Sequence, residues 1–264
     1  MFNIKQTPYG GRGLFASTPI PKDTLIMKSN PYAHVIYHVF RKEVCGFCFA
    51  YSLDGVPRKN TWTIKHCGAW FCSPSCLSEW ITEWTVPGTE MISDISVGFE
   101  RIKRKNSDEL TQLELDTSKF VLSALIYQSL HPHQPRTSLL DLQDNEIPYS
   151  RVQGDSHIRL IYGFIRQIIQ HASPKTRQAL SPLIESNERI RELLGRDGNA
   201  FGIYDVDGSQ ILGFGLYISA SYFNHSMSNP SLPFPSLLML CRLHPKHQET
   251  LLWEGDILPC DERY

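Results

Sequence analysis

The sequence lacks long apolar runs and an excess of charge of either sign. No apolar run in its 264 residues approaches the roughly 18–20 residues that a membrane-spanning helix needs. The formal net charge is −1, so no overall field favours nucleic acid or an anionic membrane as a direct partner. Residues 1–6 lack the charged head and long apolar stretch of a secretory signal peptide. We therefore expect an intracellular protein of the nucleus or the cytoplasm.

Signatures of several other protein classes are also missing. No G-x-G-x-x-G motif opens a helix, which excludes the dinucleotide-binding fingerprint. No His-x-Glu precedes the cysteine pairs described below, which argues against a zinc deaminase. The chain has no internal repeat and no low-complexity tract. A chain of this length buries roughly 75% of its unfolded surface, so it can form a true core without disulfides.

The pattern of apolar residues changes three times along the chain. Residues 1–44 are rich in glycine and proline turns and short β-type segments. Apolar residues at helical spacing then predict helices near 120–130, 160–169 and 186–194, the last ending at Gly195. Short strands return after residue 196, with a turn at Asp207-Gly208. This order predicts an α+β fold with segments 1–44, 45–80, 81–195 and 196–264.

Five of the seven cysteines lie between residues 45 and 80. Cys45 and Cys48 form a C-x2-C pair, and Cys72 and Cys76 form a C-x3-C pair. Two such pairs can meet around one tetrahedral zinc ion, and four protein ligands would close the site, so the metal would be structural. The alternative is that these are reduced cysteines packed as small apolar side chains.

Other residues near the cysteine pairs allow more than one interpretation. Cys67 and its neighbour His66 could replace one zinc ligand or belong to a degraded second site, and Cys67 could equally be a core residue. Phe71, Trp80 and Trp84 are expected to pack beneath the metal site. Alternatively, these aromatic side chains could form a groove that binds proline-rich peptides.

Residues 101–105 form a basic run. The simplest interpretation is a solvated helix face balanced by Asp108 and Glu109. The alternative is a contact with nucleic acid or with an acidic partner.

Two further segments carry polar groups that could bind a ligand. The turn at residues 10–13 is glycine-dense, so its backbone could approach a ligand closely and its N–H groups could hold a carboxylate. Residues 215–226 form an apolar and aromatic run that ends in Asn224-His225-Ser226, whose side chains both donate and accept hydrogen bonds. Taken alone, the first segment is also typical of a simple hairpin turn, and the second of a buried strand closed by a polar turn.

The order of these motifs resembles the SET-domain protein-lysine methyltransferases, in the branch with an inserted MYND-type zinc finger. The motifs are Gly11-Arg12-Gly13-Leu14, the two cysteine pairs, Asn199-Ala200-Phe201 and residues 221–226. The resemblance extends from about residue 3 to about residue 230. It implies a SET-type β-rich fold in which 1–44 and 196–264 are the SET segments, 45–80 is the finger and 81–195 is a helical insertion.

The resemblance also implies a function and a binding site. The family transfers methyl groups from S-adenosylmethionine to lysine side chains of proteins, histones among them. By resemblance, Gly11, Arg12 and Gly13 would lie along the methionine part of this cofactor. Asn224 and His225 would contact its amino group and its adenine end. The partners implied are a protein or histone lysine and, for the finger, a peptide.

The chain departs from the family after Ser226. The family continues with Cys, any residue, Pro, Asn, whereas this chain has Met227-Ser228-Asn229-Pro230. Residues 254–257 only faintly resemble the family's acidic turn, and Tyr264 is not at the expected distance from it, so no catalytic tyrosine is identified. Two interpretations stay open: a catalytically impaired protein that keeps a binding fold, or a sequence that leaves the family's reading frame after Ser226.

Overall fold

The chain's structure is a computed structural model that describes residues 2–6, 12–18, 25–53, 61–105, 110–132, 137–140, 142, 146–196, 199–222, 241–244 and 248–252. Its strands are β1 (Phe2–Gln6), β2 (Arg12–Ala16), β3 (Leu25–Ser29), β4 (Ala33–Ile36), β5 (Ile64–His66), β6 (Ala69–Phe71), β7 (Ala200–Tyr204), β8 (Ile211–Leu216), β9 (Cys241–His244) and β10 (Gln248–Leu252). Its α-helices are α1 (Pro74–Lys105), α2 (Gln112–Leu130), α3 (Thr137–Leu140), α4 (Glu146–Gln170), α5 (Pro174–Leu180) and α6 (Glu188–Leu194). Short 3₁₀ helices are η1 (His38–Phe40), η2 (Ser181–Ile184) and η4 (Ala220–Tyr222). The predicted α+β class is confirmed.

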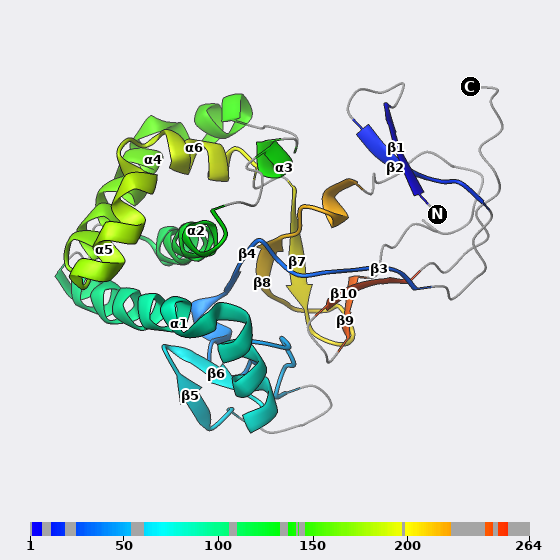
Figure 1. Cartoon of the computed structure of the whole chain (residues 1–264), viewed down its shortest axis with the longest axis horizontal. Coiled ribbons are helices and arrows are strands. Elements are labelled where there is room, and N and C mark those ends of the chain that lie inside the picture. The colour runs from blue at the N-terminus through cyan, green and yellow to red at the C-terminus, as the bar shows by residue number, and fades with distance from the viewer. Residues whose placement is uncertain are drawn as a thin grey trace.

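The strands form small antiparallel sheets that join distant parts of the chain. The described strands pair in the orders β1-β2, β3-β10-β9, β4-β8-β7 and β5-β6. Thus β3 and β4, from near the N-terminus, pair with β10 and β8, from near the C-terminus. The helices gather on one side of these sheets, and the β5-β6 hairpin lies with the start of α1 below them (Figure 1). Residues 45–195, which contain the β5-β6 hairpin and the six described α-helices, therefore connect β4 to β7.

Close backbone contact joins β4 to β8. Gly213 of β8 pairs with Ile36, and a Cβ atom at Gly213 would lie 2.1 Å from the carbonyl oxygen of Val35. Only glycine fits this approach. Just before β8, the turn from β7 contains Gly208 with φ of 75°, as the Asp207-Gly208 sequence predicts.

The predicted helices are present, with two differences in detail. A capping box starts α2: Thr111 Oγ1 accepts the Glu114 N–H at 3.3 Å, and Glu114 accepts the Thr111 N–H at 2.6 Å. Gly195 follows α6 as predicted, but its φ of −61° is right-handed, so this position does not use the freedom of glycine. The run from residue 215 is a buried strand only as far as Leu216, and a short 3₁₀ helix follows it.

Helix α1 bends near its first third. Thr85 has φ of 59° and ψ of 170°, and Pro87 opens the segment that follows it. Proline suits the first turn of a helix, where its missing N–H has no intrahelical partner. Toward the end of α1, Arg101 and Arg104 are exposed whereas Ile102 is fully buried. Arg101 and Arg104 of the basic run are therefore on the solvent side of α1, while Asp108 and Glu109, predicted to balance the run, lie outside the described residues.

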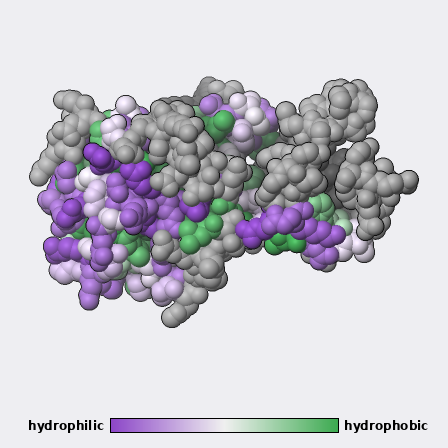
Figure 2. Space-filling view, turned by 90° about the horizontal axis from the view of Figure 1, so that it is seen from above, coloured by the Kyte–Doolittle hydropathy of each residue, from purple (hydrophilic) through white to green (hydrophobic). Residues whose placement is uncertain are grey.

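The core lies mainly among α1, α2 and α4. Phe99 of α1 meets Phe164 of α4 edge-on, with ring centroids 5.3 Å apart. Phe120 of α2 packs against Phe214 of β8 at 5.1 Å, which ties the helices to the sheet. Hydrophilic residues cover much of the described surface of the helical side (Figure 2). Among the described residues, no helix combines the length and apolarity needed to cross a membrane.

Candidate functional site

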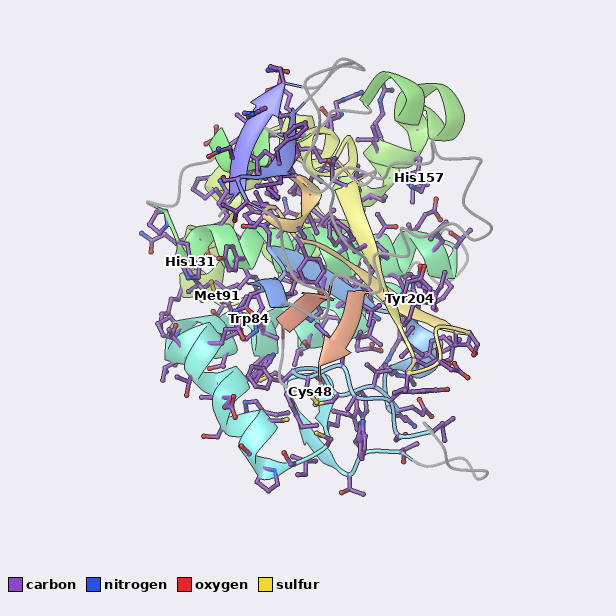
Figure 3. The ribbon with its side chains drawn as sticks, turned by 90° about the vertical axis from the view of Figure 1, so that its right-hand side faces the viewer. Cys48, Trp84, Met91, His131, His157 and Tyr204 are labelled. Atoms are coloured by element: carbon purple, nitrogen blue, oxygen red, sulfur yellow. The ribbon has the colours of Figure 1, made fainter. Side chains whose placement is uncertain are left out.

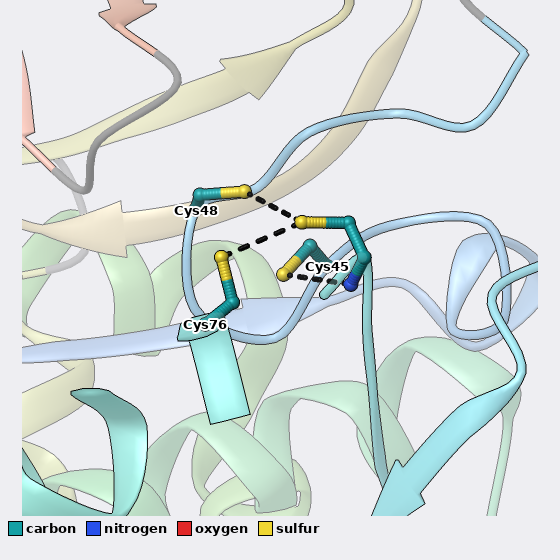
Figure 4. Close-up of side chains that lie close together, drawn as sticks. Cys45, Cys48 and Cys76 are labelled. Atoms are coloured by element: carbon teal, nitrogen blue, oxygen red, sulfur yellow. Dashed lines mark hydrogen bonds between the residues drawn. The ribbon is translucent and has the colours of Figure 1, made fainter. Parts of the chain in front are cut away.

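The four paired cysteines converge in the structure. The Sγ atoms of Cys45, Cys48, Cys72 and Cys76 all lie within 4.8 Å of one another. Cys72 Sγ is 3.5 Å from Cys48 Sγ and 3.4 Å from Cys76 Sγ, and these contacts are dashed in Figure 4. Zinc bonds of about 2.3 Å in a tetrahedron separate the sulfurs by about 3.8 Å. The four thiols are therefore close to the spacing that one zinc ion requires.

A helix cap positions the second cysteine pair. Ser73 Oγ accepts the Cys76 N–H at 3.2 Å, and Pro74 is the first residue of α1. Serine before a helix and proline at its first position are both typical of helix starts. Cys76 consequently lies in the first turn of α1, while Cys72 precedes it, and the Cys72 N–H donates to Cys45 Sγ at 3.5 Å.

A tight turn positions the first cysteine pair against strand β6. The Phe49 N–H donates to the Cys45 carbonyl at 3.0 Å, and Phe49 has φ of 55°. The Gly46 N–H donates to the Trp70 carbonyl of β6 at 2.7 Å. A Cβ atom at Gly46 would lie 2.9 Å from the Ala69 Cβ, so a residue without a side chain is needed between the two cysteines.

The pKa values of the clustered thiols show that several thiolates here would need a nearby positive charge. A hydrogen bond from Cys48 lowers the pKa of Cys45 to about 5, and the same hydrogen bond, together with burial, raises the pKa of Cys48. Burial, followed by repulsion from a charged Cys45, raises the pKa of Cys72 to about 12. The surrounding protein thus favours a thiolate at Cys45 and disfavours further thiolates at Cys48 and Cys72. A divalent cation would supply the charge that further thiolates require.

Aromatic side chains pack beside the cysteine cluster, as predicted. Phe71 and Trp80 meet edge-on at 5.5 Å, and Trp80 and Trp84 are 6.4 Å apart. These three residues are all buried. Figure 3 shows Cys48 in the lower part of the molecule, with Trp84 above it on the side of the helices. The His66 ring also meets the Trp80 ring edge-on, with ring centroids 5.8 Å apart.

Cys67 is a turn residue outside the four-cysteine group. It and Gly68 have φ of 47° and 83°, so they form the centre of a type I′ hairpin turn between β5 and β6. Its Sγ faces the Thr89 carbonyl at 3.6 Å, and its own carbonyl accepts from Ser96 Oγ at 3.0 Å. Cys67 is half-buried and packs against the main core cluster from this turn. Within the described ranges, neither Cys67 nor His66 joins a metal-type cluster.

Part of the predicted cofactor site can be located. Arg12 and Gly13 lie in β2, and the Arg12 guanidinium lies over the Tyr222 ring, 5.6 Å from its centroid. Tyr222 ends η4, two positions before Asn224. Gly11, Asn224 and His225 lie outside the described residues. The described parts of the two chain segments that carry the predicted cofactor residues are therefore in contact.

The segment before Asn224 is held by hydrogen bonds from Ser221. Its Oγ donates to the Asn199 carbonyl at 3.1 Å and to the Tyr217 carbonyl at 2.8 Å. Asn199 opens the Asn-Ala-Phe motif, so the two motifs of the C-terminal region are in direct contact. Neither Tyr222, as a partner of Arg12, nor Ser221, as a link to Asn199, is identified by sequence reasoning, because both contacts depend on long-range folding.

Comparison with known proteins agrees with the motif pattern. No protein-family profile matches the chain. It is 23% identical, over an alignment of 308 positions, to the potential protein lysine methyltransferase SET6 of Saccharomyces cerevisiae, covering 88% of this chain and 80% of that protein. It is 28% identical over 115 positions to a SET and MYND domain-containing protein of Dictyostelium discoideum, covering 42% of this chain and 21% of that protein. The predicted resemblance to SET-domain proteins with a MYND-type finger is confirmed, at low identity.

Proposed function

We propose that this protein is an S-adenosylmethionine-dependent protein-lysine N-methyltransferase. The observation that carries the proposal is the contact between Arg12 and Tyr222. It joins strand β2, which begins with Arg12 and Gly13, to the segment that leads into Asn224. The similarity to a potential protein lysine methyltransferase over 88% of the chain supports the same activity.

The residues of this chain would bind and orient the reactants. Arg12 and the backbone of Gly11 and Gly13 would hold the methionine end of S-adenosylmethionine, since a guanidinium and backbone N–H groups suit a carboxylate. Asn224 and His225 would bind its amino group and adenine end through hydrogen bonds. When bound, the cofactor supplies the methyl group. Holding the lysine amine in line with it would contribute much of the rate.

The substrate lysine must be neutral when it reacts. An apolar and aromatic channel favours the neutral amine, because burial disfavours the ammonium ion. A histone lysine is the substrate class that the resemblance suggests first. We include histones in the proposal as one protein substrate among others.

In the proposed organisation, 1–44 and 196–264 are the two SET segments, 45–80 is the finger and 81–195 is the helical insertion. The pairing of β3 with β10 and of β4 with β8 supports this division, since it joins the two outer segments. Cys45, Cys48, Cys72 and Cys76 would bind one structural zinc ion. Its role would be to hold the finger against α1, with no part in catalysis.

A second function is favoured by the sequence after Ser226. The family's Cys-x-Pro-Asn pattern is replaced there, and no catalytic tyrosine is identified. A catalytically impaired SET and zinc-finger module that recruits partners would keep the fold and the metal without the chemistry. The two functions differ in one measurable respect, which is transfer of methyl groups to protein.

A transfer assay tests the proposal. The purified full-length chain, loaded with zinc, is incubated with tritium-labelled S-adenosylmethionine and with core histones or unmethylated cell protein. Label in acid-stable methyl-lysine is the expected result, and Arg12→Ala should reduce it. Cofactor binding without any transfer would favour the interaction module, while absence of both would contradict the enzyme.

A further inference from the structure

A cavity separate from the predicted cofactor site lies between the finger and the helices. Its volume is about 600 Å³, within the roughly 300–1,000 Å³ typical of ligand sites. Residues of β4, the finger, both parts of α1 and α2 line it. None of the residues proposed above to bind S-adenosylmethionine is among its described lining residues. The cavity is therefore open to a function other than methyl transfer.

The inner wall of the cavity is apolar and aromatic. Trp80 and Trp84 come from the first part of α1, Phe99 from its second part, and Leu122 and Ile126 from α2. All five side chains are largely buried. Because each of these side chains keeps less than a tenth of its surface exposed, an apolar group that enters the cavity gains free energy only from the part of the wall that still faces it. The wall favours a ligand with an apolar side chain at its centre.

Positive charge surrounds this apolar wall. The charged residues of the described lining are Arg41, Lys42, Lys65, Arg104, Lys119 and Glu100. The five cations come from separate parts of the chain: the turn after η1, strand β5, the end of α1, and α2. Lys42, Lys65 and Arg104 are exposed, while Arg41 and Lys119 are half-buried. Because cations face the cavity from several sides, a ligand with several negative charges complements it.

Two of the cations are held by aromatic rings. Lys119 Nζ lies 5.2 Å from the centroid of Phe99, and Lys65 Nζ lies 5.0 Å from that of Trp70. Lys119 also pairs with Asp116 at 3.4 Å. Burial, with a contribution from Lys103, nevertheless lowers the pKa of Lys119. An anionic ligand would offset this unfavourable environment.

A smaller cavity of about 180 Å³ adjoins the first. Both cavities are lined by His34, Gly46, Trp80 and Trp84, so they share part of their walls. The smaller cavity reaches His131, which Figure 3 shows on the same side of the molecule as Trp84. Two adjoining cavities suit an extended ligand better than a compact one.

We propose that the cavity between the finger and the helices binds a short acidic peptide segment that carries a bulky apolar side chain. The apolar side chain would pack against Trp80 and Trp84, and acidic residues on either side would meet Lys42, Lys65 and Arg104. A basic histone tail does not fit this charge, so the site would recruit a partner protein and not the substrate tail. A nucleic acid is the competing occupant, because its phosphates would meet the same cations and its bases stack on aromatic rings.

Fluorescence anisotropy with a labelled peptide tests this proposal on the full-length, zinc-loaded chain. The probe is fluorescein-labelled Glu-Asp-Leu-Phe-Asp-Glu at low salt. We expect saturable binding, accompanied by a change in tryptophan emission. Lys42→Glu combined with Arg104→Glu should weaken binding at least about tenfold, because two favourable charge contacts become repulsive.

A matched variant separates specific contacts from general charge. Arg101→Glu combined with Arg159→Glu makes the same change in net charge at two exposed residues outside the cavity lining. It should leave the affinity within about twofold. Melting curves verify that both variants fold, and titration with S-adenosylmethionine, which the cavity variant should bind like the parent, keeps this test apart from the methyltransferase proposal.

Several results would overturn the proposal. These are no saturable binding of the acidic peptide up to about 1 mM, equal binding of a neutral proline-rich or a lysine-rich peptide, and equal loss in the two variants. Tighter binding of a short thymidine oligonucleotide than of the peptide would assign the cavity to nucleic acid instead.

Discussion

The finger and the predicted cofactor site contrast in how they are built. The four cysteines of the finger come from residues 45 to 76, and local turns set their positions. The predicted cofactor residues lie in two segments far apart in the sequence, and the described parts of these segments meet where Arg12 of β2 contacts Tyr222 of η4. The cysteine cluster can be inferred from the spacing of its residues in the sequence. The predicted cofactor site depends on contacts between segments that are far apart in the sequence. The experiments below test this contrast.

Loss of a zinc ligand should have the largest effect. Cys72 Sγ is central to the cluster, with Cys48 and Cys76 both within 3.5 Å of it. Cys72→Ser should remove bound zinc and unfold the finger, since structural zinc contributes on the order of 10 kcal/mol to such sites. Metal analysis and thermal melting would measure this. Full zinc content in the variant would contradict the four-cysteine site.

Cys67 provides the control for this experiment. It occupies a type I′ turn outside the cluster, and Asn-Gly is the preferred sequence for such a turn. Cys67→Asn should therefore keep one equivalent of zinc and change the free energy of unfolding by less than about 1 kcal/mol. Loss of zinc in this variant would instead make Cys67 a ligand.

A side chain placed between β4 and β8 should have the next largest effect on stability. A methyl group at Gly213 would lie 2.1 Å from the Val35 carbonyl oxygen, which belongs to the backbone and cannot turn aside. Gly213→Ala should destabilise the protein by about 3 kcal/mol. Denaturant unfolding would measure the loss. Gly163→Ala is the matched control: no atom lies within 4 Å of its added Cβ, and the residue is in α4, so stabilisation of roughly 0.5–1 kcal/mol is expected.

These contrasts explain how much of the molecule can be predicted from its sequence. The cysteine cluster, the α+β class and the helices near 120–130 and 160–169 follow from local spacing and periodicity. The turn role of Cys67 does not, because a positive φ at cysteine depends on the hairpin around it. Nor does the contact of Arg12 with Tyr222, whose partners are far apart in the sequence. Gly195 follows α6, as its residue type predicts, but its backbone angles are right-handed helical and do not require glycine.

A smaller effect is expected at the cofactor site. Arg12→Ala removes the guanidinium that lies over Tyr222, and it should weaken S-adenosylmethionine about tenfold by the loss of one charge-assisted contact. Calorimetric titration would measure the affinity. Lys5→Ala is the matched control, because Lys5 also lies over an aromatic ring, that of Phe15, on the neighbouring strand. Equal weakening by both substitutions would contradict a specific role for Arg12.

The smallest effect concerns the start of α2. Burial raises the pKa of Glu114, but hydrogen bonds from Thr111 and the contact with His157 outweigh it, so the pKa is lower than usual. A carboxyl group whose pKa is lowered by folding stabilises the folded state at pH values above its unfolded pKa, which is near 4.5. This stabilisation is lost as the pH falls through the pKa of the folded state. Glu114→Gln keeps the capping box but removes the charge, so it should cost less than about 1 kcal/mol at pH 7 and less still as the pH falls below 4.5. Denaturant unfolding at several pH values would measure this, and a constant difference would contradict it.

The central claim is that both ends of the chain form one S-adenosylmethionine site. The most direct measurement is calorimetric titration of the zinc-loaded, full-length chain with S-adenosylmethionine, together with its melting temperature. We predict saturable heat and a higher melting temperature, because a ligand that binds the native state must stabilise it. No heat and no stabilisation, in a sample that holds its zinc, would contradict the account.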